Sequence, residues 1–225
     1  FKAVEDSKVD FGIVVDPDVD RLVLIANKGI PFGEENTITQ AVKFILSKEK
    51  GSVVVNLSTT RGVEDVAKEY GCEVYRSKVG EANVVKKMKE VNAVIGGEGS
   101  GGVIYPAIHY GRDALVGIAI TLQHLLEFDG TMTQLKDDLP NYSICKKKVE
   151  LLNIDSDDVI DRLKNKYNQE RINTEDGLRI DFEDFWVHLR KSNTEPIIRI
   201  ITEAKSVEEA EKYASEFLKE LTSVR

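Results

Sequence analysis

The fold class is decided by residues 53–95, which read VVVNLSTTRGVEDVAKEYGCEVYRSKVGEANVVKKMKEVNAVI. Short apolar runs alternate here with segments in which apolar residues recur at helical spacing. The expected strands are 53–55, 73–75 and 93–95, and the expected helices are 63–70 and 82–91. Gly71 follows the first helix, at the position where a left-handed residue commonly ends a helix. Strands that alternate with helices predict an α/β layer with a largely parallel sheet.

The same pattern continues on both sides of this stretch. Two apolar runs, at 11–15 and 22–26, predict buried strands, and the apolar spacing at 34–47 predicts a helix. Downstream, a glycine loop at 96–102 precedes Asp113, which we expect to cap a helix that ends at residue 126.

The order of elements changes after the polar segment 129–141, which indicates a domain boundary. The expected elements are a strand at 142–151, a helix at 156–166, strands near 178–180, 185–190 and 197–202, and a final helix. That helix begins with the capping box Ser206-Val207-Glu208-Glu209, and Val207 belongs to its expected apolar face. The whole chain is therefore predicted as α/β, a largely parallel α/β domain followed by a smaller α+β C-terminal domain with an antiparallel sheet.

Length and charge exclude some classes of function. The chain has 225 residues, enough for one large or two modest domains. Its formal charge of -8 argues against non-specific binding to nucleic acid or to anionic membranes, which requires a basic face. The sequence contains no apolar run long enough to span a membrane.

Two cysteines, Cys72 and Cys145, occur without a CxxC motif or a Cys/His cluster. This usage fits a reducing compartment, so a cytoplasmic location is expected and a zinc site is not. The chain opens at Phe1 without a methionine, and we expect it to be a piece of a longer protein.

The first candidate site is the loop Asp16-Pro17-Asp18-Val19-Asp20-Arg21. Three carboxylates at alternate positions on a turn that leaves a strand can converge on one hard divalent cation. An EF-hand is excluded, because its sixth and twelfth positions would be Arg21 and Asn27 instead of Gly and Glu. The alternative is a solvated acidic turn, which the two flanking apolar strands disfavour.

The second candidate is the loop Gly96-Gly97-Glu98-Gly99-Ser100-Gly101-Gly102. Glycines let the backbone approach a ligand closely, and Glu98 and Ser100 offer a carboxylate and a hydroxyl that suit a sugar. A flexible turn is the alternative for such a run.

The third candidate is Arg190-Lys191-Ser192-Asn193-Thr194-Glu195-Pro196. A guanidinium, two hydroxyls, an amide and loop N–H groups form a suitable site for a phosphate. Taken by itself, an ordinary hairpin turn with a surface Arg explains this segment equally well.

Together, and in this order, the three loops resemble those of the α-D-phosphohexomutase superfamily. The superfamily's metal loop is written D-G-D-G-D-R, its sugar loop G-E-x-S-G and its phosphate loop R-x-S-N-T-x-P. Lys78-Val79-Gly80-Glu81 also resembles a short motif of the family's third domain, in which a Lys and a polar residue face the substrate. The resemblance covers essentially the whole chain.

The resemblance implies a domain division and an activity. Residues 1–30 would be the tail of the metal-binding second domain, 31–138 the sugar-recognition third domain and 139–225 the phosphate-binding fourth domain. Members interconvert hexose 6-phosphates and hexose 1-phosphates through a phosphoserine and a bisphosphorylated hexose. No segment here resembles the serine loop, so the expected partners are the hexose phosphate and the missing N-terminal domains. By itself the chain is expected to be inactive.

The resemblance also assigns roles to residues. Asp16, Asp18 and Asp20 are implied to bind Mg²⁺. Glu98 and Ser100 are implied to bind sugar hydroxyls. The phosphate that is not transferred would contact Arg190, Ser192, Asn193 and Thr194. The expected catalytic residues are Arg21, Lys78 and His109.

Two positions depart from the family pattern, and two more have an expected structural role. Many members have His after the sugar loop, where this chain has Gly102, and nearby His109 is a candidate to take part of that role. Glu81 replaces a His of some mannose- and glucose-type members, which favours phosphoglucosamine as the substrate. Arg112 and Asp113 are expected only to cap and position a helix.

Three alternative functions remain open at this point. Phosphomannomutase or phosphoglucomutase activity is one, and assays on the three hexose phosphates discriminate it. A non-catalytic sugar-phosphate-binding protein is another, which absence of the serine loop from the full-length chain would favour. A metal-dependent phosphatase with an aspartate nucleophile is the third, and phosphate release would reveal it.

Overall fold

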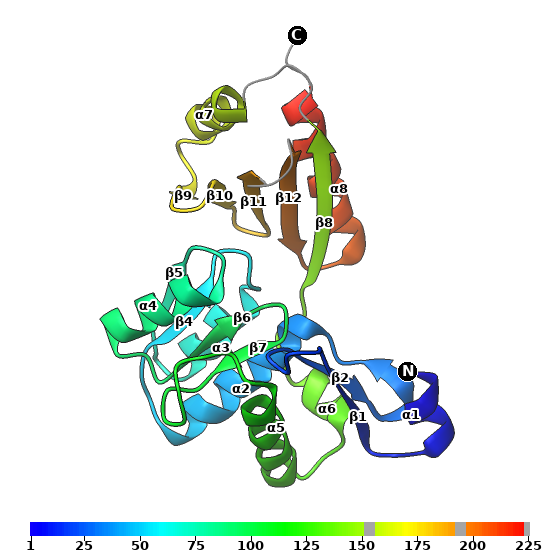
Figure 1. Ribbon diagram of the computed structural model, residues 1–225. Helices are drawn as coiled ribbons and strands as arrows, with labels where there is room; N and C mark the ends of the chain where they lie inside the picture. The colour runs from blue at the N-terminus through cyan, green and yellow to red at the C-terminus, as the bar shows by residue number, and fades with distance from the viewer. Residues whose placement is uncertain (151–155, 192–196, 223–225) are drawn as a thin grey trace. The chain divides into compact units, whose positions relative to one another are not determined.

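The computed structural model describes residues 1–150, 156–191 and 197–222 (Figure 1). The chain forms two compact units, Phe1–Asn141 and Tyr142–Arg225. None of the helices in the described ranges is both long and apolar enough to cross a membrane.

The first unit begins with a small antiparallel sheet of order β1-β2-β3. Its elements are α1 (Lys2–Ser7), β1 (Phe11–Val15), β2 (Leu22–Ala26), the 3₁₀ turn η1 (Asn27–Gly29) and β3 (Ile30–Pro31). The predicted bounds of β1 and β2 are confirmed, but the prediction that β1 is buried is wrong. Ile13, Val14 and Val15 are 43%, 49% and 39% exposed, because β1 is an edge strand that pairs only with β2 among the described residues.

The second sheet of this unit has the order β5-β4-β6-β7. Its elements are α2 (Glu34–Lys48), β4 (Val53–Asn56), α3 (Gly62–Glu69), β5 (Val74–Ser77), α4 (Glu81–Val91), β6 (Ile95–Glu98), β7 (Gly102–Ile104) and α5 (Ala114–Phe128). β5, β4 and β6 are parallel and β7 is antiparallel to β6, which confirms the largely parallel sheet. One hydrophobic cluster packs α2, α3 and α5 against this sheet, and a second one packs α4.

The parallel strands bring three loops to one edge of the sheet. Their carboxyl ends are Asn56 of β4, Ser77 of β5 and Glu98 of β6. Open α/β sheets bind ligands outside the carboxyl ends of their strands, next to a strand whose two neighbours are connected on opposite sides of it. In this sheet β4 lies between β5 and β6, so the expected ligand position is beside the carboxyl end of β4.

The glycine loop is shorter than the sequence indicated. The expected strand ended at residue 95, whereas β6 continues to Glu98 and β7 begins at Gly102, so only 99–101 form the turn. A Cβ on Gly97 would lie 2.2 Å from the Gly102 carbonyl oxygen, and Gly101 has a φ of +86°. The glycines therefore permit a close hairpin and are not a flexible tract.

The segment 129–141 belongs to the first unit. It contains α6 (Met132–Asp137), which the sequence analysis missed, and Met132, Leu135 and Leu139 are buried in a cluster with Leu22 and Leu24 of β2. The division at residues 30 and 138 remains a prediction.

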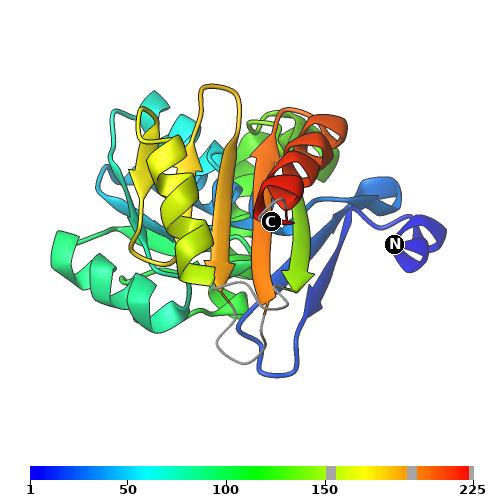
Figure 2. The same cartoon turned by 90° about the horizontal axis from the view of Figure 1, so that it is seen from above.

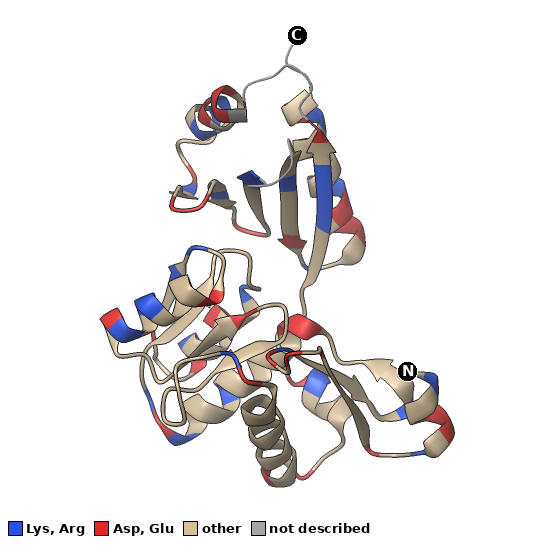
Figure 3. Ribbon diagram, viewed as in Figure 1, with Lys and Arg blue, Asp and Glu red and all other residues tan. Residues whose placement is uncertain are grey.

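The second unit is a five-stranded antiparallel sheet of order β8-β12-β11-β10-β9. Its elements are β8 (Ser143–Glu150), α7 (Ser156–Lys166), β9 (Arg171–Asn173), β10 (Leu178–Asp181), β11 (Trp186–Lys191), β12 (Ile197–Ala204) and α8 (Val207–Thr222). The two helices lie on the same face of the sheet (Figure 2), and residues 146–148 form a basic run on β8 (Figure 3). The antiparallel C-terminal sheet is confirmed.

The final helix is capped as expected, but its apolar face is narrower. The Ser206 hydroxyl accepts a hydrogen bond from the N–H of Glu209 at 3.1 Å. Val207 is 57% exposed, so its assignment to the apolar face is wrong. The buried face consists of Ala210, Ala214, Phe217 and Leu221.

Candidate metal and sugar-phosphate site

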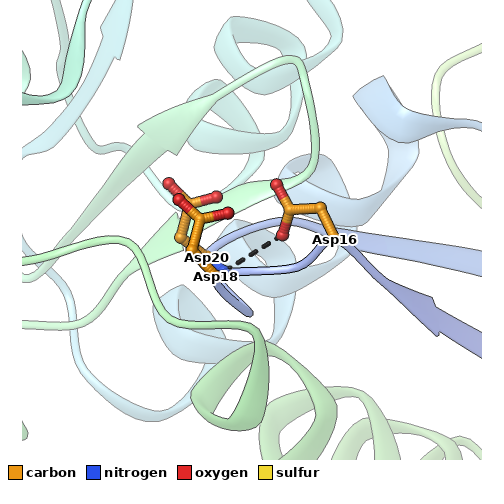
Figure 4. A group of neighbouring side chains, drawn as sticks. All are labelled: Asp16, Asp18 and Asp20. Carbon is orange, nitrogen blue, oxygen red and sulfur yellow. Dashed lines mark hydrogen bonds between the residues drawn. The ribbon is translucent and has the colours of Figure 1, made fainter.

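The metal loop connects two paired strands. Val15 of β1 lies opposite Leu22 of β2, so the loop 16–21 is closed at its base. The Asp16 carboxylate accepts a hydrogen bond from the Asp20 N–H at 3.2 Å (Figure 4). It accepts another from the Arg21 N–H at 3.1 Å. One oxygen each of Asp16, Asp18 and Asp20 lies within 4.8 Å of the others. The structure thus gathers all three predicted ligands.

The raised pKa of Asp20 and an unsatisfied carboxylate oxygen in this loop favour a bound cation. Desolvation raises the pKa of Asp20, against the charge of Arg112, and the neighbouring acids raise it further. Desolvation also acts on Asp16, but hydrogen bonds from Arg21 and its neighbours outweigh it and lower the Asp16 pKa. Asp20 Oδ1 is buried and accepts no hydrogen bond from the described residues. A divalent cation with oxygen ligands would satisfy that atom, so the residues fit Mg²⁺.

Two other residues shape the loop. Val19 has a left-handed φ of 57°, which is rare for a β-branched residue, and its carbonyl accepts the Ala114 N–H at 3.0 Å. Arg21 places Nε at 3.6 Å from Asp16 Oδ2 and 3.7 Å from Asp20 Oδ1, with half of its side chain exposed. Arg21 therefore lies beside the acids as expected.

Glu98 is the centre of the sugar loop and is only 4% exposed. Its Oε1 accepts hydrogen bonds from Asn56 Nδ2 at 2.7 Å and from the Gly80 N–H at 2.9 Å. Its Oε2 accepts one from Arg112 Nη1 at 2.7 Å. Ser100 lies in the hairpin turn, and its hydroxyl has no partner among the described residues. That both residues bind sugar hydroxyls remains a prediction.

Arg112 was expected only to cap and position a helix, but its guanidinium joins the metal loop to the sugar loop. Its Nη2 pairs with Asp20 Oδ2 of the metal loop, its Nη1 with Glu98, and its Nε lies 3.5 Å from Glu81 Oε2. Burial alone would lower the pKa of Arg112, but the three carboxylates outweigh burial and raise the pKa above its usual value. The only local signal was its position before the helix cap, because its partners are distant in the sequence.

Several residues that the sequence did not predict also hold the sugar loop in place. Asn56 and Thr59 are almost completely buried, and the Gly99 N–H donates to the Thr59 hydroxyl at 3.0 Å. Arg76 donates to the carbonyls of Asn56 and Thr59 at 2.9 and 2.6 Å. The loop that follows β4 therefore fixes the loop that follows β6.

Lys78 and His109 lie near this edge with different surroundings. Lys78 directly follows β5 and is exposed, and its ammonium has no partner in the described part of the chain. His109 Nε2 lies 2.9 Å from Asp113 Oδ2. Asp113 also caps α5, as predicted, and the His109 hydrogen bond is the main cause of its lowered pKa. A Cβ on Gly111 would lie within 3.3 Å of both His109 Nδ1 and Glu81 Oε1, so both side chains lie close to Gly111.

The phosphate loop lies in the second unit and is described only at its start. Arg190 Nε lies 3.0 Å from Asp176 Oδ2, and among the described residues its terminal nitrogens have no hydrogen-bond partner. Ser192, Asn193 and Thr194 lie outside the described residues. The assignment of these four residues therefore remains a prediction.

Comparisons with known proteins agree with this geometry. The family profile "Phosphoglucomutase/phosphomannomutase, alpha/beta/alpha domain III" matches residues 34–142, and that of the family's C-terminal domain matches 147–220. A relative from Methanopyrus kandleri named probable phosphoglucosamine mutase is 33% identical over 222 residues, which cover 96% of this chain and 49% of the relative. This chain spans about half the length of the curated relatives it matches.

Two solved structures have the same fold. The phosphoglucomutase/phosphomannomutase family protein of Burkholderia thailandensis has a TM-score of 0.83 at 24% identity and covers 99% of this chain with 48% of its own. Aspergillus fumigatus N-acetylphosphoglucosamine mutase, solved with GlcNAc-6P and magnesium, has a TM-score of 0.67 at 15% identity, covering 94% and 48%. The chain therefore belongs to the phosphoglucomutase/phosphomannomutase family within the α-D-phosphohexomutase superfamily and carries the C-terminal region of that family.

Proposed function

We propose that this chain is part of a Mg²⁺-dependent phosphohexomutase that interconverts hexose 6-phosphate and hexose 1-phosphate, with phosphoglucosamine as its substrate. The observation that carries this proposal is the joining of the three-aspartate loop to Glu98 of the sugar loop through one guanidinium, that of Arg112. A phosphoserine on the preceding domains and a bisphosphorylated hexose complete the proposed reaction. A cytoplasmic location, based on the two free cysteines, is part of the proposal.

The first unit would hold the metal and the sugar. Asp16, Asp18 and Asp20 would bind Mg²⁺, which when bound neutralises charge on a transferring phosphoryl group. Arg21 and Lys78 would add fixed positive charge around that group. Ser100, at the tip of the hairpin, would bind a sugar hydroxyl beside Glu98.

A proton must also move when a sugar hydroxyl attacks or leaves. His109 is the candidate, because Asp113 accepts from its Nε2 and so leaves Nδ1 as the base. The distal phosphate would be bound by Arg190, Ser192, Asn193 and Thr194 through charged and neutral donors.

The choice of hexose rests on Glu81 and on the relatives. The Glu81 carboxylate is 38% exposed beside Arg112, so an ammonium group of glucosamine phosphate could pair with it. The M. kandleri relative named probable phosphoglucosamine mutase supports the same substrate. Phosphomannose and phosphoglucose are the alternatives, in line with the family's description.

The proposal is tested with the full-length protein in coupled assays on glucosamine, mannose and glucose 6-phosphates with Mg²⁺. We expect the highest kcat/KM on glucosamine 6-phosphate and no turnover by residues 1–225 supplied with a bisphosphorylated hexose. Release of inorganic phosphate without isomerisation would instead indicate a phosphatase. Binding without turnover by the full-length protein would indicate a sugar-phosphate-binding protein.

A further inference from the structure

Arg112 lies where the metal loop meets the sugar loop. We infer that Arg112 is a positioning residue that fixes Asp20 and Glu98 relative to each other, and that its side chain takes the space of a side chain at position 102. The inference rests on the proposed function, because it assigns a metal to Asp20 and a sugar to the Glu98 loop.

The three carboxylates around Arg112 require a cation between them. Asp20, Glu81 and Glu98 surround its guanidinium, and the exposed fractions of the Asp20, Glu98 and Arg112 side chains are 17%, 5% and 14%. Carboxylates this poorly hydrated repel one another strongly unless a cation separates them. The fork geometry of a guanidinium lets one residue bond two of them at once.

The route of the Arg112 side chain explains why residue 102 is glycine. Gly102 of β7 lies opposite Glu98 of β6. A Cβ on Gly102 would be 2.4 Å from Arg112 Cδ and 3.1 Å from its Cγ. The arginine therefore passes directly over the Gly102 Cα to reach Glu98. The space over residue 102 is therefore filled by a side chain from ten residues downstream.

This placement has opposite consequences for the metal and for the sugar loop. The guanidinium engages Asp20 Oδ2 and places a positive charge beside the metal-binding oxygens, so it opposes Mg²⁺. Its removal should tighten Mg²⁺ binding by about tenfold, from the repulsion of a single and a double charge about 5 Å apart in a water-like dielectric. Removal should also release Glu98, whose Oε1 holds the Gly80 N–H.

The first experiment measures both effects on residues 1–225. Calorimetry gives the Mg²⁺ affinity of the wild type, Arg112→Gln and the control Arg21→Gln, and hydrogen exchange gives the protection of 79–82 and 97–102. We expect tighter Mg²⁺ binding in both variants, but lost protection only in Arg112→Gln, because Arg21 does not contact Glu98. General damage to the fold would weaken Mg²⁺ binding instead, and that result overturns the inference.

The outcomes separate this inference from the proposed function. If the wild type binds no Mg²⁺ at millimolar concentrations, the metal assignment and this inference both fail. If it binds Mg²⁺ and Arg112→Gln neither tightens binding nor exposes the two segments, only this inference fails.

A double-mutant cycle tests whether Arg112 and a side chain at position 102 compete for the same space. Gly102→Ala in the wild type should lower the melting temperature by about 3–9 °C, because a pinned side chain must move. The same substitution in Arg112→Ala should cost almost nothing, because the three atoms nearest to that Cβ are all from the Arg112 side chain. Equal losses in the two backgrounds would overturn the steric half of the inference.

Discussion

Replacement of the Glu98 carboxylate by an amide, Glu98→Gln, should destabilise the first unit well beyond an ordinary loss of a hydrogen bond. Glu98 is 4% exposed and accepts three hydrogen bonds, one of them from Arg112. An amide NH₂ in place of either oxygen would face a hydrogen-bond donor, Arg112 Nη1 on one side or Asn56 Nδ2 and the Gly80 N–H on the other, and the charge that pairs with Arg112 would be lost. Breaking one partner of a buried ion pair costs about 3–5 kcal/mol.

Glu64→Gln is the matched control. Glu64 is likewise paired with an arginine, and it accepts two hydrogen bonds, at 2.8 Å from Arg76 Nε and 2.6 Å from Arg76 Nη2, but its side chain is 36% exposed. Water can hydrate what the substitution leaves behind, so we expect a loss of about 1 kcal/mol or less.

Urea unfolding followed by far-UV circular dichroism measures both variants against the wild type. We expect the Glu98→Gln loss to exceed the Glu64→Gln loss at least twofold. Equal losses, or a Glu98→Gln variant as stable as the wild type, would refute the conclusion that burial of Glu98 makes its pairing with Arg112 essential.

Three further predictions concern the metal, the phosphate and pH. Mg²⁺ should bind residues 1–225 weakly, because three carboxylates supply only part of the octahedral oxygen shell that Mg²⁺ requires. Asp18→Ala should abolish the calorimetric signal, and identical titrations of the two would contradict the metal site. In the full-length enzyme, Arg190→Ala should weaken substrate binding by about 10- to 100-fold, which is the equivalent of one charged hydrogen bond. Arg190→Lys should recover only part of the lost affinity. Unchanged KM and kcat in Arg190→Ala would contradict the assignment of the phosphate loop. Burial, and to a smaller extent the charge of Lys43, lowers the pKa of His124 to about 4. The neutral imidazole therefore makes its full contribution to the free energy of unfolding above about pH 6.5. This contribution is lost as the pH falls towards 4, by at most about 1.4 kcal/mol per pH unit. His124→Phe should flatten that pH dependence in urea titrations, and an unchanged slope would contradict it.

Local patterns were sufficient to predict most elements. Helix α7 and strands β1 and β2 have the predicted bounds, because a run of apolar residues or a helical period is itself the local cause of the element. Short elements such as α6 and β9 were missed, since they depend on tertiary packing more than on their own periodicity.

The candidate site was predictable to the same extent. The three aspartates lie within one loop, so their convergence follows from alternate spacing on a turn. The contact of Arg112 with Asp20 joins residues 92 positions apart, and no local pattern encodes it. The burial of Glu98 likewise depends on Asn56, Gly80 and Arg112, which come from the end of β4 and from two separate loops.

The exposed edge of β1 affects how this chain behaves in solution. Ile13, Val14 and Val15 present apolar side chains along a strand whose outer edge has no neighbour among the described residues. Such an edge can pair with the same edge of another copy, and natural proteins usually prevent this with a lysine, a proline or a covering segment. We therefore expect residues 1–225 to self-associate as their concentration rises. Val14→Lys is the substitution that should keep them dispersed for the measurements described above.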